Sequence, residues 1–267
     1  MKRTYDIMRK KLEEGRVLVG AGTSTTDESF VDIIGYQKCI DVLWIELEHS
    51  HIDAPAIYRD TLVAQSHDMA VVCRMPWNDP VRVKPLLDLG VDGLIFPMIK
   101  TVDDVRLAVA SCKYPPVGIR GFAPGRVAQY GTVSDEEYLS WADNSVFVTV
   151  QIEQKEAVEN IEEICKVPGL DCVLIGCSDL SGSYGHLQKT HTPDIYAAID
   201  RISEAAQANG VFLATAMPPT DENMERFLSH GIQMFFGGGD GGWVAAGAHA
   251  YAEKLQGHAR ALGKNLD

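Results

Sequence analysis

Two acidic residues follow consecutive apolar segments of the chain. Glu153 directly follows the segment 146–152, and Asp179 comes shortly after the segment 172–175. A stretch with a helical pattern, 156–165, separates the two segments. If the segments are neighbouring parallel strands, their carboxyl ends lie on one rim and the two carboxylates converge there. Carboxylates with open positions around them are typical ligands of a hard divalent cation.

Gln151 and Ser178 stand beside these acids and add neutral polar groups to the same rim. The alternative is that Glu153 caps the following helix and that Asp179 forms a turn, which are common roles for acids near the end of a strand. We favour the cation site because further polar residues are expected at the same rim.

An imidazole and a guanidinium end two earlier segments. His49 follows the segment 42–47, and Arg74 ends the segment 70–74. A cation that polarises a carbonyl, a cationic side chain that holds enolate charge and a base of near-neutral pKa together suit metal-assisted proton transfer. Arg74 could instead pair with Glu48, although a charge buried at the end of an apolar strand costs free energy unless it has a function.

Short apolar segments alternate with amphipathic helices along the whole chain. The predicted strands are 17–22, 42–47, 70–74, 93–97, 146–152, 172–175, 212–215 and 234–237. The predicted helices include 54–67, 81–89, 102–111, 195–209, 221–229 and a last helix over 243–262. Eight such units predict an α/β fold, a (β/α)8 TIM barrel, as one domain over 1–267. A doubly wound sheet is less consistent, because no Gly-x-Gly-x-x-Gly follows the first strand.

The composition excludes several classes of protein. The formal net charge is −13 and the pI is about 5.0, which disfavours nucleic acid and anionic membranes as partners. The six cysteines include no C-x-x-C pair, which indicates a reducing compartment without a disulfide framework. With no signal-like apolar start and no long apolar run, we expect a soluble cytoplasmic protein.

Two glycine-containing segments are candidates for binding. The connection 113–144 is long for a compact domain and carries Arg120 and Arg126 among glycines. We expect it to bend over the barrel mouth and to help select the aldehyde partner, favouring small or acid-bearing aldehydes, or else to form a subunit contact. The run 237–242 follows the last strand, but its Asp240 would repel a phosphate, so we interpret it as a turn that caps the last helix.

Several of these residues belong to longer motifs that resemble those of a known protein family. The motifs are Trp44-Ile45-Glu46-Leu47-Glu48-His49, Arg74-Met75-Pro76, Leu86-Leu87-Asp88-Leu89-Gly90, Arg120-Gly121, Gln151-Ile152-Glu153 and Ser178-Asp179-Leu180-Ser181. In this order they resemble the HpcH/HpaI group of class II, metal-dependent pyruvate aldolases, over about 15–255. The resemblance implies a TIM barrel, a divalent cation (magnesium, manganese or cobalt) and a homohexamer whose terminal helix is exchanged between neighbours.

The resemblance also implies a binding role for four of these residues. Glu153 and Asp179 would be the metal ligands, and Gln151 with the backbone at Ser178 would hold the oxo acid. The small-molecule partners would then be a 2-oxo acid and an aldehyde.

For catalysis, the resemblance implies that His49 acts as base through a metal-bound water and that Asp88 orients it. Arg74 would stabilise the enolate oxygen. Two positions depart from the family pattern: Glu46 stands where an aspartate is common, and Cys177 stands where a proline is usual, which suggests a looser oxo-acid pocket.

The resulting prediction is an enzyme, a class II aldolase. As a carbon–carbon lyase it would cleave or form 4-hydroxy-2-oxo acids through a metal-bound pyruvate enolate. No lysine occupies a recognisable Schiff-base position in these motifs, which favours the metal enolate over an imine. An acyl-CoA lyase of the citrate-lyase type, a 2-oxo acid decarboxylase and a non-enzymatic binding barrel remain alternatives.

Overall fold

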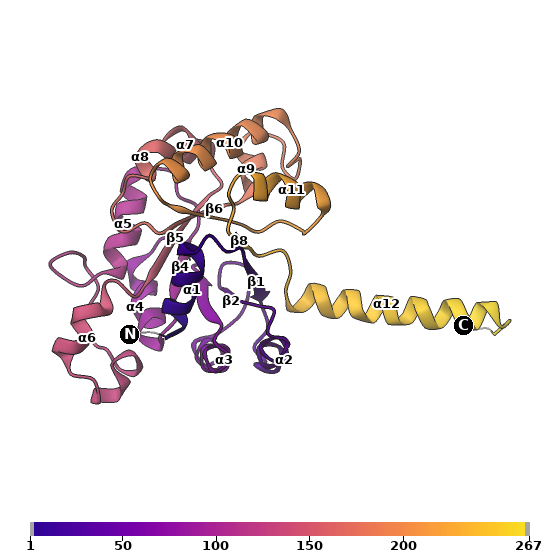
Figure 1. Ribbon diagram of the computed structural model, residues 1–267, viewed down its shortest axis with the longest axis horizontal. Helices are drawn as coiled ribbons and strands as arrows, with labels where there is room; N and C mark the ends of the chain where they lie inside the picture. Colours follow the sequence, from indigo (N-terminus) through magenta and orange to yellow (C-terminus); the bar gives the residue numbers. More distant parts are fainter. Residues whose placement is uncertain (1–2, 265–267) are drawn as a thin grey trace.

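The computed structural model describes residues 3–264 and contains one closed barrel of eight parallel strands (Figure 1). The strands are β1 (Leu18–Thr23), β2 (Val42–Glu46), β3 (Ala70–Arg74), β4 (Gly93–Phe96), β5 (Phe147–Ile152), β6 (Cys172–Ile175), β7 (Phe212–Thr215) and β8 (Met234–Phe235). Each strand pairs in parallel with the next, and β8 pairs with β1. The predicted (β/α)8 barrel is therefore confirmed.

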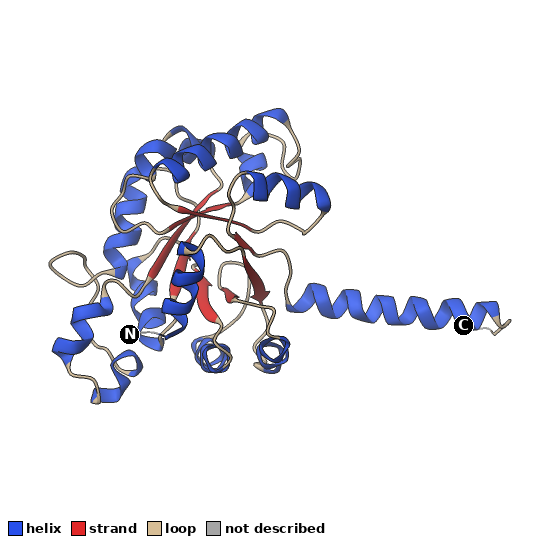
Figure 2. Ribbon diagram, viewed as in Figure 1, coloured by secondary structure: helices blue, strands red, loops and turns tan. Residues whose placement is uncertain are grey.

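Helices surround the strands on the outside, as Figure 2 shows. They are α1 (Arg3–Glu13), α2 (Ser29–Gln37), α3 (Ala54–Ser66), α4 (Pro80–Leu89), α5 (Val102–Cys112), α6 (Asp135–Ala142), α7 (Lys155–Glu159), α8 (Ile161–Ile164), α9 (Cys177–Ser183), α10 (Pro193–Ala208), α11 (Asp221–Ser229) and α12 (Asp240–Ala261). A 3₁₀ segment, η1 (Arg126–Gly131), precedes α6. The helical stretch predicted over 156–165 is divided into α7 and α8 at Asn160.

Successive side chains of each strand pack on opposite faces of the barrel wall. In β2, Val42 and Trp44 belong to the cluster inside the barrel, while Leu43 and Ile45 pack under the helices. Met8 and Leu12 of α1 belong to the inner cluster as well. Helix α1 thus closes the end of the barrel at which the strands begin, and the opposite end remains open for a site.

Local sequence determines where several helices begin after the strands. The side chains of Asp53, Asp79 and Thr101 each accept a backbone N–H at the first turn of α3, α4 and α5, respectively. Asp53 and Asp79 are each followed by proline in the first turn of the helix. These caps fix the short loops at the carboxyl ends of the strands.

The long connection 113–144 joins α5 to β5, so it leads to the beginning of a strand. It contains η1 and α6, and its Tyr114 and Tyr138 form a small buried cluster with their hydroxyl oxygens 3.0 Å apart. Helix-to-strand connections of a (β/α)8 barrel lie at the end opposite to its active site. The expectation that this segment bends over the mouth of its own barrel does not hold.

Helix α12 extends away from the barrel (Figure 1). Along α12, the side chains that remain exposed include Val244, Tyr251 and Leu255, which are 69%, 72% and 53% exposed. Asp240, at the start of α12, is its buried residue. None of the described helices has the length and apolar character needed to cross a membrane.

Candidate active site

A cavity of about 510 Å³ opens at the carboxyl ends of the strands. Five of the residues to which the sequence assigns a metal-binding, substrate-binding or catalytic role line it: His49, Arg74, Gln151, Ser178 and Asp179. The other lining residues are Gly22, Thr23, Ser24, Trp44, Glu46, Leu174, Gly176, Cys177, Ala216, Phe236, Gly238, Gly239, Asp240, Gly241 and Gly242. The predicted convergence of strand ends on one rim is thus present.

Glu153 does not line the cavity itself: it is only 1% exposed and lies directly behind Gln151 and Gly176, which do line it. Its Oε1 accepts a hydrogen bond from the backbone N–H of Met98 at 2.6 Å, and its Oε2 accepts one from Nε2 of Gln151. Gly176 makes room for this pair, since a Cβ at that position would lie 3.0 Å from Cβ of Glu153. Gln154, not Glu153, is the residue that precedes α7 as its N-cap.

Asp179 lies in the first turn of α9, beyond β6. Burial raises the pKa of Glu153, and the nearby charge of Asp179 raises this pKa further. An acid whose charge is disfavoured by a neighbouring carboxylate is arranged as it would be for a cation shared with that neighbour.

The donor groups present fit a divalent cation of the magnesium type. Glu153 and Asp179 supply carboxylate oxygens, and the buried Oε1 of Gln151 has no hydrogen-bond partner among residues 3–264. The described part of the chain contains no cluster of three or more His, Cys, Asp or Glu ligands. A cation here would therefore take its remaining ligands from water and substrate, as magnesium commonly does.

Arg74 reaches the cavity while it is held by two glutamates. Its Nε lies 2.7 Å and its Nη2 2.5 Å from Oε2 of Glu46, and its Nη1 lies 3.1 Å from Oε2 of Glu48. The guanidinium also lies over the Trp44 ring, 5.1 Å from its centroid. Arg74 thus pairs with Glu48, as the alternative interpretation expected, and also lines the cavity.

Glu46 has a positioning role that the sequence did not reveal. Its Oε1 accepts the backbone N–H of Glu48 at 2.7 Å and that of His49 at 3.1 Å. One carboxylate therefore joins the guanidinium of Arg74 to the turn that carries His49. The signal for this role is the acid three positions before the histidine, which the sequence marked only as a departure from the family pattern.

The imidazole of His49 is 68% exposed, and its Nε2 lies 3.8 Å from Oε2 of Glu48. His51, two residues further on, is exposed and does not line the cavity. An imidazole at the rim that is free of strong partners can exchange protons with substrate or water.

Asp88 and Arg120 do not line this cavity. Nη2 of Arg120 lies 2.6 Å from Oδ1 of Asp88, and the guanidinium lies over the Tyr114 ring, 4.6 Å from its centroid. Asp88 is near the last residue of α4, at the end of the barrel where strands begin, whereas His49 follows the end of β2. Within one chain, therefore, Asp88 does not orient His49. Arg126 likewise lies away from the cavity and donates to the carbonyl of Leu89.

Asp240 follows β8, and its side chain links this part of the chain to the loop that follows β1. Its carboxylate accepts the backbone N–H groups of Ser24, Thr25 and Gly241 at 2.7, 2.9 and 2.7 Å. It also accepts the hydroxyls of Thr23 at 3.1 Å and Ser24 at 3.2 Å. The interpretation of Asp240 as the cap of the last helix is wrong: Gly239 is the N-cap of α12, without a side-chain cap hydrogen bond, and Asp240 is the first residue of the helix. Its carboxylate instead fixes one wall of the cavity.

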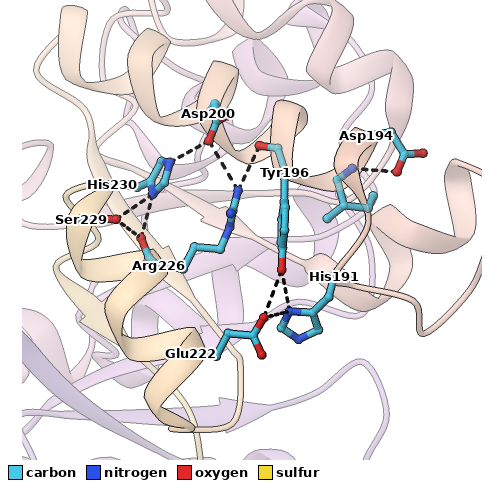
Figure 3. A network of polar contacts seen from close by, with 9 residues as sticks. His191, Asp194, Tyr196, Asp200, Glu222, Arg226, Ser229 and His230 are labelled. Carbon is cyan, nitrogen blue, oxygen red and sulfur yellow. Dashed lines mark hydrogen bonds and ion pairs between the residues drawn. The ribbon is translucent and has the colours of Figure 1, made fainter.

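A second hollow of about 440 Å³ meets the cavity at Ser178 and Ala216. His191 and Glu222 line it, with Nδ1 of His191 3.0 Å from Oε1 of Glu222. They belong to the polar network of α10 and α11 in Figure 3. In this network Arg226 stacks over the Tyr196 ring, 3.5 Å from its centroid.

The chain is similar to known proteins over most of its length. The family model described as HpcH/HpaI aldolase/citrate lyase matches residues 25–246. A 4-hydroxy-2-oxo-heptane-1,7-dioate aldolase of Klebsiella pneumoniae is 35% identical over 221 residues, which cover 80% of this chain and 81% of the relative. A 5-keto-4-deoxy-D-glucarate aldolase of Escherichia coli K12 is 31% identical over 242 residues, or 90% of this chain and 93% of the relative.

A solved structure gives the same result. The HpcH/HpaI aldolase/citrate lyase family protein of Burkholderia cenocepacia superposes with a TM-score of 0.87 at 28% identity and covers 94% of this chain and 99% of its own. The family that the sequence motifs indicate is confirmed: the chain belongs to the HpcH/HpaI aldolase/citrate lyase family.

Proposed function

We propose that this protein is a divalent-metal-dependent aldolase that cleaves or forms 4-hydroxy-2-oxo acids, with pyruvate or a related 2-oxo acid as one product. The observation that carries the proposal is the convergence of Asp179, Arg74 and His49 at one cavity, with Glu153 directly behind Gln151 of its lining, in a barrel that belongs to an aldolase family. The names of the two aldolase relatives agree with a small-molecule substrate of this class.

Glu153 and Asp179 would hold the cation, which we expect to be magnesium, manganese or cobalt. When bound, such a cation would supply polarisation of the keto group of a 2-oxo acid. Gln151 and the backbone at Ser178 would orient the oxo acid beside it. Gln151 is well placed for this, because its amide is held by Glu153 while its Oε1 has no hydrogen bond within the described chain.

Arg74 would hold the negative charge that develops on the keto oxygen as the enolate forms. Glu46 and Glu48 fix the guanidinium, so little reorganisation is needed during the reaction. In cleavage, His49 would accept the proton of the C4 hydroxyl through a water molecule, and the bond between C3 and C4 would break to give enolate and aldehyde. In synthesis, His49 would remove a proton from the methyl group instead.

The described lining of the cavity contains no lysine. An imine with the substrate would need such an amine, so the residues present favour an enolate route. For Asp88 to orient His49, as the family likeness implies, it would have to come from a neighbouring subunit.

We further propose that the protein is a homo-oligomer, a hexamer with α12 exchanged between neighbours. The exposed apolar side chains of α12, Val244, Tyr251 and Leu255, support a packed partner for this helix. The six free cysteines support a cytoplasmic location. Sedimentation of the full chain measures the oligomer directly, and a monomer would contradict this part of the proposal.

Lyase activity on a panel of 4-hydroxy-2-oxo acids tests the proposed reaction. Pyruvate release can be followed by coupling to lactate dehydrogenase, with the enzyme first treated with a chelator and then supplied with magnesium, manganese or cobalt. We expect pyruvate release that depends on added metal. No release from any member of the panel, with metal present, would contradict the proposal.

A further inference from the structure

The described residues that line the cavity include few positive charges. Glu46, Asp179 and Asp240 contribute carboxylates, and Arg74 is the one guanidinium among them. Arg74 is paired with Glu46 and Glu48. A cation bound at the acid pair would be shared with the carboxylate of the oxo acid. Apart from the imidazole of His49, no side chain of the described lining that can carry a positive charge is left to pair with a second carboxylate on the aldehyde.

The described residues that line the adjoining hollow add no free cation. His191, on its wall, is paired with Glu222, and Tyr196 donates to the same Glu222 oxygen at 3.2 Å. Arg226 lies behind them and is occupied by the Tyr196 ring and by Asp200, whose Oδ1 is 3.4 Å from Nη2 (Figure 3). Gln188 and Thr190, which are neutral, contribute to the same wall.

The Arg120–Asp88 pair would not add net positive charge to the cavity. If another subunit presented Arg120 at the cavity, the attached Asp88 would accompany it, and the pair carries no net charge. The acid-bearing aldehydes expected from Arg120 are therefore disfavoured by the residues that line the site. Arg126, which donates to the carbonyl of Leu89 and to Oε1 of Gln65, does not line the cavity.

The cavity wall formed by Asp240 offers hydrogen-bond acceptors to a substrate. Burial opposes the charge of Asp240, but hydrogen bonds from the backbone of Ser24, Gly241 and Thr25 outweigh it and lower the pKa of this carboxyl group. An ionised carboxylate can only accept hydrogen bonds, so the hydroxyls of Thr23 and Ser24 must donate their protons to it. Toward a substrate, these hydroxyls can therefore only accept a hydrogen bond through their lone pairs.

A substrate group that meets this wall must donate a hydrogen bond. An alcohol can do so, whereas an ionised carboxylate has no proton to offer and would face the lone pairs of Ser24 and the charge of Asp240. We propose that this protein takes an uncharged, hydroxyl-bearing aldehyde as its second substrate and that Ser24, positioned by Asp240, recognises a hydroxyl of that aldehyde. This inference rests on the proposed aldolase function and names the class of its second substrate.

The test is condensation of pyruvate with glyceraldehyde, propanal and succinic semialdehyde by the full-length, metal-loaded enzyme. We expect the highest kcat/KM with glyceraldehyde. In Ser24→Ala, the ratio of kcat/KM for glyceraldehyde to that for propanal should fall about two- to tenfold, which corresponds to one hydrogen bond between neutral groups. Ser29→Ala, an exposed serine nearby in sequence but outside the cavity lining, is the matched control and should leave this ratio unchanged.

Asp240→Asn provides a second variant. Its amide would donate as well as accept hydrogen bonds, so the wall would no longer offer acceptors alone. The kcat/KM for succinic semialdehyde should therefore rise relative to that for glyceraldehyde. A wild-type preference for succinic semialdehyde, or a Ser24→Ala variant whose kcat/KM falls equally for all three aldehydes, would overturn the inference. Exchange of the methyl protons of pyruvate, measured without aldehyde, reports separately on the proposed function: if exchange occurs while the aldehyde preferences fail, only the inference is wrong.

Discussion

Arg120 and Asp88 form an ion pair, with 2.6 Å between Nη2 and Oδ1, at the end of the barrel away from the cavity. The guanidinium is almost wholly buried, since the side chain of Arg120 is 2% exposed, whereas that of Asp88 is 27% exposed. The pair and the stacked Tyr114 ring attach the connection 113–144 to α4. Two residues expected at the active site thus have a clear structural role in their own chain.

Arg120→Ala should therefore destabilise the fold. The loss should be below the roughly 3–5 kcal/mol that follows from breaking a fully buried pair, because Asp88 keeps contact with solvent. Denaturant unfolding measures it, with Arg106→Ala as the control, since Arg106 and Asp103 form an exposed pair. If Arg120→Ala is as stable as the control and changes aldehyde selectivity, Arg120 acts in the cavity of another subunit instead.

His49→Ala should reduce activity about 10²–10⁴-fold, the usual contribution of a general acid–base group. Its melting temperature should stay within a few degrees of the wild type, because the side chain is 68% exposed. His51→Ala, in the same connection but outside the cavity lining, should keep its activity. A His49→Ala protein that unfolds, or that exchanges the methyl protons of pyruvate at the wild-type rate, would refute this role.

Arg74→Lys should lower kcat by at least about tenfold, given typical losses of 10²–10³-fold for an oxyanion donor. An ammonium cannot contact Glu46 and Glu48 in the geometry of the guanidinium fork. Arg59→Lys, at an exposed pair with Glu28, serves as the control. An effect on metal affinity alone would make Arg74 a structural partner of Glu48.

Asp60 of α3 predicts a pH dependence of stability. It is fully buried, neither carboxylate oxygen has a hydrogen-bond partner among the described residues, and burial followed by the charge of Glu28 raises its pKa to about 6. The folded state holds the proton more tightly than the unfolded chain, so the free energy of unfolding should fall as the pH rises from about 4 to about 6.

Asp60→Asn removes the charge and should be more stable than the wild type at pH 8, by about 1–3 kcal/mol, the cost of an unsatisfied buried group. The difference should shrink below pH 4, where the wild-type acid is neutral. Urea unfolding at several pH values measures this, with the exposed Glu204→Gln as control. A pH-independent difference would show that Asp60 is not ionised in the folded protein.

The sequence was sufficient for the fold because each unit carries a local signal. Short apolar segments and helical periodicity mark the barrel strands and most helices, and Asp53 and Asp79 mark helix starts. The common rim followed from topology alone. The end of the barrel at which the connection 113–144 lies followed from the predicted order as well, because the helix 102–111 precedes it and the strand 146–152 follows it. The expectation that it bends over the mouth overlooked this order, and the elements η1 and α6 within it were not predicted.

Side-chain partners across the barrel were equally hidden. The contact of Asp240 with Ser24 joins residues more than two hundred positions apart, and the link from Glu46 to Arg74 crosses two strands. Both depend on strand register, which a single sequence does not specify. They explain why an acid that the sequence assigned to a turn also shapes the cavity wall.

The central claim is that Glu153 and Asp179 support formation of an enolate by holding a divalent cation. The most direct measurement is exchange of the methyl protons of pyruvate in D₂O, followed by NMR, for the chelator-treated wild type, Glu153→Gln and Asp179→Asn, with and without added magnesium, manganese or cobalt. The account predicts metal-dependent exchange by the wild type and little exchange by either variant, because each has lost one of two charged ligands. Equal exchange by all three proteins, or wild-type exchange that needs no added metal, would contradict it.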